Sequence, residues 1–274
     1  MKWPVLRLLA LLKKRNNPLM SLLRSELESF LGAIRFFTRL PVPASVGHSE
    51  DGLNRSAHYF PLMGVIVGGV AALVFWGADM LWPKSVSILL SMAATLYLTG
   101  AFHEDGLSDM ADGLGGGWDK TRILEIMKDS RVGSYGVVAL VLALLSKFIL
   151  LNEFSAAWLP ATLIAGHAVS RLCATALLVT MDYVREDDSS KAKPLATRMT
   201  ADGFALAVVL ILPTLFFLPP SAVMAGGALA LISTLWISGL LSRWLGGYTG
   251  DCLGGVQQVS ELAFYLGVLA VLPR

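Results

Sequence analysis

Long hydrophobic runs separated by short polar stretches dominate the pattern of this chain. A helix needs about 17–25 residues to cross a ~30 Å hydrocarbon core. Runs of that order lie near residues 60–82, 86–102, 135–151, 159–181, 203–219 and 222–242, with a weaker, more polar run near 256–272. Backbone amides in lipid must be paired within their own segment, and no alternating barrel strands are found. The pattern therefore predicts an all-α, polytopic membrane bundle of about six to seven transmembrane helices.

A different pattern precedes the first long run. Apolar residues recur between positions 19 and 40 at three- and four-residue spacing, with charged residues among them. This periodicity predicts an amphipathic helix lying at the membrane interface. Residues 41–58 have the Pro, Gly and Ser content of a loop. Residues 1–20 are interpreted as an N-terminal extension with Met20 as an alternative start, and residues 21–274 as one integral-membrane domain.

Composition agrees with a membrane protein. Of 274 residues, 55% are hydrophobic and only 15% are charged, more apolar surface than a soluble fold of this length could bury. The net charge of +2 is too small to indicate nucleic acid as a partner. Cys173 and Cys252 show neither metal-ligand spacing nor a disulfide framework, and we interpret both as packing residues.

The distribution of Lys and Arg predicts the orientation in the membrane. With residues 1–59 inside, eighteen cationic residues fall on the inner side, and two, Lys84 and Arg274, fall on the outer side. Cytoplasmic loops carry such an excess of positive charge. The segments between the second and third runs, and after the sixth, are therefore expected on the cytoplasmic face.

One of these segments is strongly acidic. Residues 102–113 read FHEDGLSDMADG and contain Glu104, Asp105, Asp109 and Asp112. At about 100° per helical residue, the three aspartates fall at about 0°, 40° and −20°, on one stripe, with Glu104 beside it. Such neighbouring charges repel unless a divalent cation lies between them, and oxygen ligands suit Mg²⁺. The spacing predicts a Mg²⁺ site; a solvated acidic loop is the alternative.

Three further segments on the same predicted face could recognise phosphate. The Gly-rich run LGGGW, residues 114–118, offers backbone N–H groups, although a flexible linker explains it equally. In KDSRVGSYG, residues 128–136, Asp129 could add a metal ligand, and Lys128 and Arg131 could neutralise phosphate or simply anchor the next helix. In GGYTGDCLGG, residues 246–255, one carboxylate, Asp251, lies among glycines.

Three basic residues fall inside predicted membrane helices. His167 and Arg171 are four positions apart and share a helix face. An intramembrane Arg is costly, so it is normally functional or paired within the bundle. Lys147 is expected near the outer end of its helix, where its side chain could reach the interface.

An aspartate stripe with Gly-rich and cationic segments at one membrane face is typical of phosphoryl transfer. The DxxDG of residues 109–113 resembles the CDP-alcohol phosphotransferases, but Leu114 and Gly115 replace the Ala-Arg of that family and its downstream DxxxD pair is absent. A cation transporter is the non-enzymatic alternative. Transporters, however, usually place binding carboxylates near the bilayer midplane rather than at one surface.

The ordered set of segments resembles another family more closely. It comprises RFFTRLPVP (35–43), HYFPLMG (58–64), FHEDGLSDMADGLGG (102–116), KDSRVGSYG (128–136), HAVSR (167–171) and GGYTGDCLGG (246–255). Together they resemble cobalamin synthase, the adenosylcobinamide-GDP ribazoletransferase family, from about Glu26 to the end. The family usually has an acidic residue soon after its last Gly-rich segment, where this chain has Gln257 and Gln258 before Glu261.

The resemblance implies a Mg²⁺-dependent transferase of the bacterial inner membrane that joins adenosylcobinamide-GDP to α-ribazole, or its 5′-phosphate, and releases GMP late in cobalamin biosynthesis. On this basis Asp105, Asp109, Asp112 and Asp129 are the expected metal ligands, Arg131 steadies GMP, and Glu104 or Asp251 accepts the proton. The expected substrate-binding residues are Gly113, Gly115, Gly116, Lys128, Ser130, Gly133, His167, Arg171, Gly247, Thr249 and Gly250. The expected partners are the two substrates and the lipid bilayer. Both a monomer and a homo-oligomer are compatible with the sequence.

Overall fold

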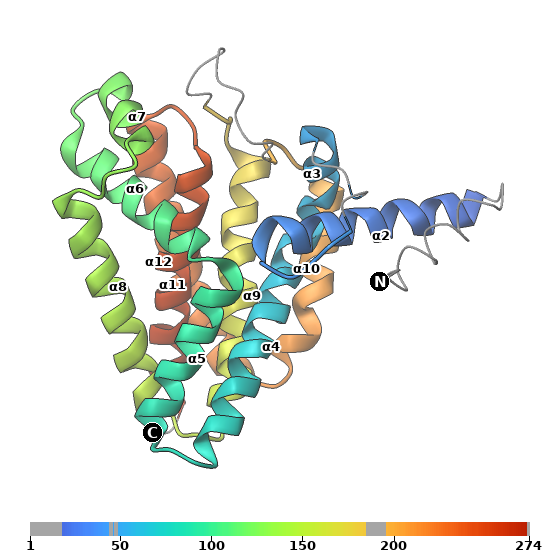
Figure 1. Cartoon of the computed structure of the whole chain (residues 1–274), viewed down its shortest axis with the longest axis vertical. Coiled ribbons are helices and arrows are strands. Elements are labelled where there is room, and N and C mark those ends of the chain that lie inside the picture. The colour runs from blue at the N-terminus through green and yellow to red at the C-terminus, as the bar shows by residue number, and fades with distance from the viewer. Residues whose placement is uncertain (1–17, 44–45, 47–48, 185–195, 273–274) are drawn as a thin grey trace.

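The computed structural model describes residues 18–43, 46, 49–184 and 196–272, and the regular elements in these ranges are helices (Figure 1). They are α2 (Pro18–Phe37), α3 (Glu50–Ser56), the 3₁₀ turn η1 (Ala57–Tyr59), α4 (Phe60–Asp79), α5 (Lys84–Thr99), α6 (Phe102–Gly116), α7 (Lys120–Lys128), α8 (Ser134–Glu153), α9 (Leu159–Thr180), α10 (Ala201–Leu215), α11 (Pro220–Trp244) and α12 (Gly250–Leu269). The all-α prediction is confirmed. Most of the predicted extension, residues 1–17, lies outside these ranges, whereas the alternative start, Met20, lies in the first turn of α2.

The helices include fewer clear membrane spans than the hydrophobic runs predicted. Four stretches in the described residues are long and apolar enough to cross a bilayer, namely 50–79, 134–153, 159–180 and 220–244. The bent pair of α5 and α6 raises this number to five if it is one span. Helix α10 has only 15 residues. The arrangement is that of a multi-pass membrane protein.

The predicted span 86–102 is interrupted. Helix α5 ends at Thr99, and the chain turns by 85° into α6. Gly100 and Ala101 both have left-handed backbone angles, with φ of +70° and +58°. A left-handed residue ends a helix, and two in succession redirect the chain. The acidic motif therefore lies on a separate helix that runs at a steep angle to α5.

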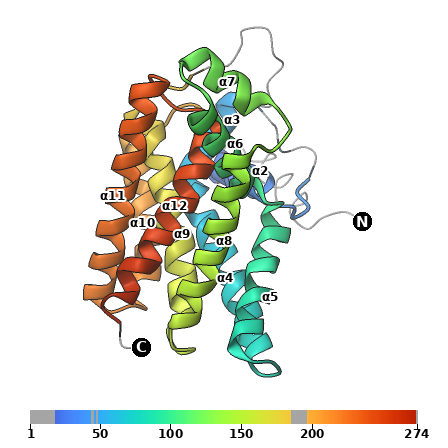
Figure 2. The ribbon, with the colours of Figure 1, turned by 90° about the vertical axis from the view of Figure 1, so that its left-hand side faces the viewer.

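Small residues bring the central helices close together. Helix α4 packs along α9, and α11 along α12 (Figure 2). A Cβ added at Gly68 would lie 2.7 Å from Cα of Ile164 in α9, so only a glycine permits this approach. Gly64, one turn earlier, meets the backbone of His167 as closely. Such small-residue contacts allow helices to pack closely in a membrane, where the hydrophobic effect does not drive their association.

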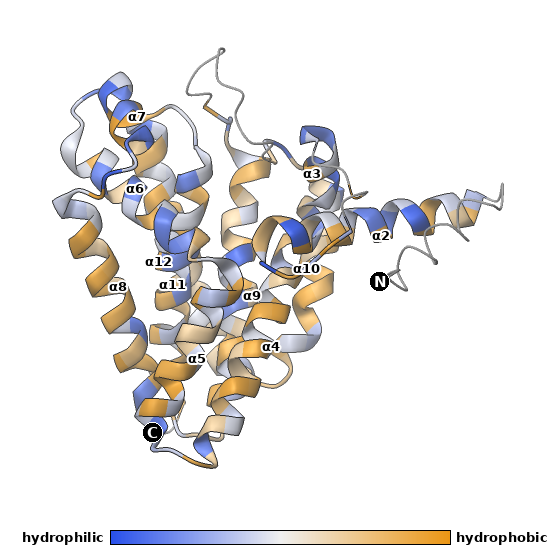
Figure 3. Cartoon of the chain, in the orientation of Figure 1, coloured by the Kyte–Doolittle hydropathy of each residue, from blue (hydrophilic) through white to orange (hydrophobic). Residues whose placement is uncertain are grey.

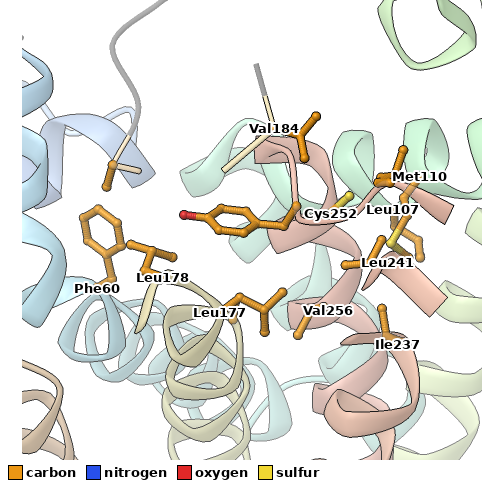
Figure 4. Packing of buried hydrophobic residues seen from close by; sticks show 14 of the residues in the cluster. Phe60, Leu107, Met110, Leu177, Leu178, Val184, Ile237, Leu241, Cys252 and Val256 are labelled. Atoms are coloured by element: carbon orange, nitrogen blue, oxygen red, sulfur yellow. The ribbon is translucent and has the colours of Figure 1, made fainter. Parts of the chain in front are cut away.

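Polar and apolar residues separate along the bundle. Hydrophobic residues are frequent along α4, α5, α8 and α10, whereas hydrophilic residues gather at the end with α3, α6 and α7 (Figure 3). Just inside this polar end, a buried apolar cluster joins α6, α9, α11 and α12 (Figure 4). Its members include Leu107, Leu177, Leu241 and Val256. The cluster fixes α6 and its carboxylates against the membrane helices.

Helix α2 confirms the helical prediction for residues 19–40, but the predicted loop over 41–58 is wrong in its second half. There α3 begins at Glu50, and the side chain of Ser49 accepts a hydrogen bond from the Gly52 amide at 3.1 Å. A Ser followed by two acidic residues is a helix start signal, which stabilises even this short helix. The overall Pro, Gly and Ser content concealed that signal.

Candidate active site

The polar end of the bundle brings together three segments that the sequence predicts on one membrane face. They are the acidic helix α6, the loop before α8 and the start of α12. Helix α6 crosses the first turn of α12 at Gly106 and Gly254, with the loop before α8 beside them. A Cβ added at Gly106 would lie 2.8 Å from the carbonyl oxygen of Asp251 and 3.1 Å from its Cα. The crossing therefore places Asp251, far away in the sequence, directly against the acidic helix. These segments lie together at one end of the bundle, and the membrane face on which they lie stays a prediction.

The predicted stripe of aspartates lies on one helix, but its members have different surroundings. Asp105 is exposed, Asp109 is partly buried, and Asp112 is only 7% exposed. Glu104 is partly buried on a neighbouring face, where its Oε1 accepts a hydrogen bond from Gln258 Nε2 of α12 at 2.9 Å. The stripe thus runs from solvent at Asp105 into the protein at Asp112.

Asp112 caps helix α8. Its Oδ2 accepts a hydrogen bond from the Gly133 amide at 2.7 Å, and its Oδ1 accepts one from the Gly136 amide at 2.9 Å. These are among the unpaired amides of a helix N-terminus, which favours a negative charge. A Cβ at Gly133 or Gly136 would overlap this carboxylate, which explains both glycines. Gly133, expected to bind substrate, therefore also binds Asp112 through its backbone.

The expected phosphate loop over residues 114–118 is wrong for its first part. Helix α6 continues through Gly116, and the Gly117 amide donates to the Gly113 carbonyl at 2.9 Å. The glycines instead permit close packing, because Gly115 lies under the ring of Tyr135 and Gly113 against Met127 of α7. Amide groups paired inside a helix are not available to a phosphate.

The loop between α7 and α8 carries a pair of opposite charges. The guanidinium of Arg131 contacts the carboxylate of Asp129 through two nitrogens, the shorter distance being 2.6 Å. These hydrogen bonds lower the pKa of the Asp129 carboxyl to about 2. Ser130 is exposed between them, and Lys128 is the last residue of α7. The expected metal ligand and the expected GMP ligand therefore pair with each other.

A short backbone bridge fixes the segment before α12. The Tyr248 amide donates to the Asp182 carbonyl at 3.0 Å, and the Val184 amide donates to the Tyr248 carbonyl at 2.8 Å. Gly247 packs against the Asp182 backbone too closely for any Cβ. Thr249 then caps α12, whose first residue is Gly250. This bridge fixes the start of the helix that carries Asp251.

A network of buried polar residues lies deeper in the bundle. It was not predicted from the sequence. Glu261 of α12 pairs with Lys147 of α8 at 2.6 Å. It also accepts hydrogen bonds from Tyr265 at 2.8 Å and Gln257 at 2.7 Å. Lys147, expected to reach the outer interface, is instead 5% exposed and points inward to this acid. Glu261 in the last apolar run could have indicated this network, because a charge inside the membrane requires a partner.

His167 and Arg171 join this network and share a helix face, as predicted. His167 Nδ1 lies 3.4 Å from Glu261 Oε2 and 3.2 Å from Arg171 Nη1. Both side chains are 3% exposed. Arg171 also lines a narrow pocket with Phe37, Phe102 and Gly250. The two residues are therefore paired inside the bundle rather than displayed at its polar end.

Two of the carboxylates suit a Mg²⁺ ion whose other ligands would be waters and substrate phosphates. Among the side chains that the structure describes, no three acidic, His or Cys groups are positioned as a ready set of metal ligands. Mg²⁺ commonly uses one or two carboxylates, several waters and substrate phosphates rather than a closed protein cage. Asp105 and Asp109, one turn apart on α6, are a donor set of that kind.

Known proteins that are similar to this chain are named as a synthase and as transferases, in agreement with the group-transfer chemistry predicted for the site. Residues 29–269 match the family described as cobalamin-5-phosphate synthase. The chain is 49% identical to the adenosylcobinamide-GDP ribazoletransferase of Shewanella amazonensis over 258 residues, covering 91% of this chain and 98% of that protein. It is 45% identical to the protein of the same name from Vibrio parahaemolyticus, covering 90% and 94%, and 46% identical to that from Ralstonia pickettii, covering 92% and 98%. No solved structure matches.

Proposed function

Because the chain belongs to the cobalamin-5-phosphate synthase family and acts as an adenosylcobinamide-GDP ribazoletransferase, we propose that its reaction centre is the crossing of α6 and α12. The observation that supports this site is the contact of Gly106 with the backbone of Asp251. It unites the acidic motif with the last Gly-rich segment, the two stretches richest in groups suited to phosphoryl transfer.

The aspartate stripe would hold Mg²⁺ together with the pyrophosphate of adenosylcobinamide-GDP. Asp105 and Asp109 would be the primary ligands, and Asp112 and Asp129 would add negative charge around the ion. When bound, Mg²⁺ offsets the negative charge of the phosphates and of the leaving group. Asp112 has a second task here, because its bonds to Gly133 and Gly136 fix the loop that faces the substrate.

The transfer exchanges one phosphorus–oxygen bond for another. The ribose 3′-hydroxyl of α-ribazole, or of its 5′-phosphate, attacks the phosphorus attached to the aminopropanol arm. The bond from that phosphorus to the bridging oxygen breaks, and GMP leaves with the bonding electron pair. Arg131 exchanges Asp129 for a GMP phosphate oxygen, since a guanidinium fork suits either partner. Lys128 and Ser130 contact the same leaving group.

Asp251 is the preferred base that accepts the hydroxyl proton. It lies in the first turn of α12 next to Gly106, at the polar end of the bundle. Glu104, the other candidate, binds Gln258 through Oε1 and connects to the buried network through it, and its Oε2 is buried away from solvent. A base must lie within hydrogen-bond reach of the proton that it removes. Glu104 therefore suits a positioning role between α6 and α12.

The inner membrane is the proposed location, with α6, α7 and the start of α12 on the cytoplasmic side. The excess of Lys and Arg at this end supports the orientation. Together with the four stretches that are long and apolar enough to cross a membrane, helices α5, α10 and α12 give a bundle of about six to seven spans. The family match over residues 29–269 supports a single transferase domain over residues 21–274.

The test is GMP release from adenosylcobinamide-GDP and α-ribazole by the full chain in lipid nanodiscs. Activity should require Mg²⁺, and Asp109→Asn should lower kcat by at least about 10²-fold while the protein remains folded in the nanodiscs. Asp119→Asn, an exposed helix cap on α7, is the matched control. Undiminished turnover of Asp109→Asn, or full activity in EDTA, would reject the metal assignment. Release of GMP also separates this function from cation transport.

A further inference from the structure

A large polar pocket lies outside the reaction centre, between α2, α3 and the start of α10. It has a volume of about 570 Å³, and we call it the α2/α3 pocket. Helix α2 projects sideways from the bundle next to it (Figure 1). The charged and polar side chains that line it and matter below are Glu26, Asp51, Asn54, Arg55, His58 and Arg198. None of them has a place in the proposed transfer reaction.

The fold brings two arginines to this pocket from distant parts of the chain. Asn54 Oδ1 accepts hydrogen bonds from the amides of Thr197 and Arg198 at 2.8 and 3.2 Å. This contact holds the backbone of Arg198 against α3, and Arg198 and Arg55 both line the pocket. Among the described residues neither guanidinium has an acidic partner within ion-pair distance. Two unpaired guanidinium groups in one hollow form a phosphate-binding arrangement.

Carboxylate oxygens also line the pocket, from Glu26 of α2 and from Asp51, one turn before Arg55 on α3. Glu26 of α2 accepts a hydrogen bond from Tyr59 at 2.8 Å and lies 3.3 Å from His58 Nε2, so its carboxylate is firmly positioned. Asp51 adds a second carboxylate. A bare inorganic anion would be repelled by these acids. A ligand that joins a phosphate to hydroxyl groups would bind the guanidinium groups through its phosphate and the carboxylates through its hydroxyl groups.

The surroundings of the pocket indicate where such a ligand comes from. Leu22 precedes the pocket-lining Glu26 by one turn on α2 and is 58% exposed. Leu206 follows the pocket-lining Gly203 on α10 and is 42% exposed. Apolar side chains thus continue from the polar pocket along both helices. A phosphate site bordered by exposed leucines is typical of a lipid–water interface.

We propose that the α2/α3 pocket binds the headgroup of an anionic phospholipid, with Arg55 and Arg198 on the phosphate and Glu26 accepting hydrogen bonds from glycerol hydroxyls. The acyl chains follow the exposed leucines of α2 and α10. A phosphatidylglycerol headgroup supplies both the phosphate and the hydroxyls. This contact would fasten the projecting helix α2 to the membrane surface.

The test compares the full chain in nanodiscs of phosphatidylcholine alone and with added phosphatidylglycerol. Phosphatidylglycerol should raise the unfolding temperature of the wild-type protein by about 3 °C or more. The double variant Arg55→Gln/Arg198→Gln should lose this shift and keep its activity in phosphatidylcholine. Arg243→Gln, which removes an exposed charge beside Trp244 on α11, should retain it.

A third arm adds glycerol 3-phosphate to the phosphatidylcholine nanodiscs. The lipid assignment predicts no stabilisation of the wild-type protein there, because the acyl chains are missing. An equal shift with the soluble phosphate that the double variant loses would assign the pocket to a soluble ligand instead. A double variant that responds to phosphatidylglycerol like the wild type would overturn the site itself. If the wild-type protein released no GMP, that result would contradict the proposed reaction centre but not the lipid site.

Discussion

Lys147 and Glu261 form an ion pair at 2.6 Å inside the bundle, where their side chains are 6% and 1% exposed. The pair joins α8 to α12, and Tyr265, Gln257 and His167 surround its acidic member. It lies beneath the crossing of α6 and α12 and connects to Glu104 through Gln257 and Gln258. The proposed reaction centre therefore lies above a charged interior network rather than an apolar core alone.

Removing one member of this pair should strongly destabilise the protein. Lys147→Met leaves the Glu261 carboxylate buried without its cation, at a cost of about 3–5 kcal/mol. Thermal unfolding in nanodiscs measures the loss, and Lys147→Met/Glu261→Gln should recover part of it. Arg24→Gln, which breaks the partly exposed Arg24–Glu28 pair of α2, should change stability by about 1 kcal/mol or less. Equal effects of the two single changes would contradict the structural role of the buried pair.

Asp112→Asn should lower stability as well as activity, because the Asp112 carboxylate caps α8. The neutral amide still accepts one hydrogen bond but loses the charge that favours the N-terminus of α8, at a cost of about 1–2 kcal/mol. Unfolding and kcat should be measured on the same preparations. If Asp112→Asn lost activity at unchanged stability, the carboxylate would act on the metal or substrate rather than through α8.

Gly106→Ala should separate α6 from α12 at the reaction centre. The added methyl group meets the Asp251 backbone at 2.8 Å, so one helix must shift. We expect a loss of about 1–3 kcal/mol in stability and, since small displacements of catalytic groups are costly, about 10²-fold in kcat. Gly239→Ala on α11, with no atom within 4 Å of the new methyl group, is the matched control. An active Gly106→Ala enzyme would argue against this crossing as the reaction centre.

The Asp129–Arg131 pair should resist acid. The pKa of Asp129 is lowered to about 2 by Arg131, below its ordinary value of 3.8. A lowered carboxyl pKa stabilises the folded state above the ordinary value, and this stabilisation is lost as pH falls toward 2. The difference in unfolding temperature between wild type and Asp129→Asn should therefore be the same at pH 7 and pH 5, and decrease only below about pH 4. A difference that changes between pH 7 and pH 5 would contradict the pairing.

The sequence predicted the helices and the shared stripe of Asp105, Asp109 and Asp112 because both follow from spacing along the chain. Helical periodicity decides which side chains share a face, and that rule needs no knowledge of distant residues. The ordered motifs also indicated the family, since they occupy short contiguous segments. Boundaries were less accurate where local backbone geometry intervened, as at Gly100 and Ala101, whose left-handed angles separate α5 from α6.

Only the tertiary structure decided what those residues contact. Spacing did not indicate that Asp112 caps α8 or that Lys147 pairs with Glu261, because these partners come from other helices. The same holds for Asp251 at Gly106 and for Arg198 at Asn54. A side chain's face is set by its own helix, but its partner is set by where helices cross. Those crossings depend on close packing at small residues, which no single segment of the sequence encodes.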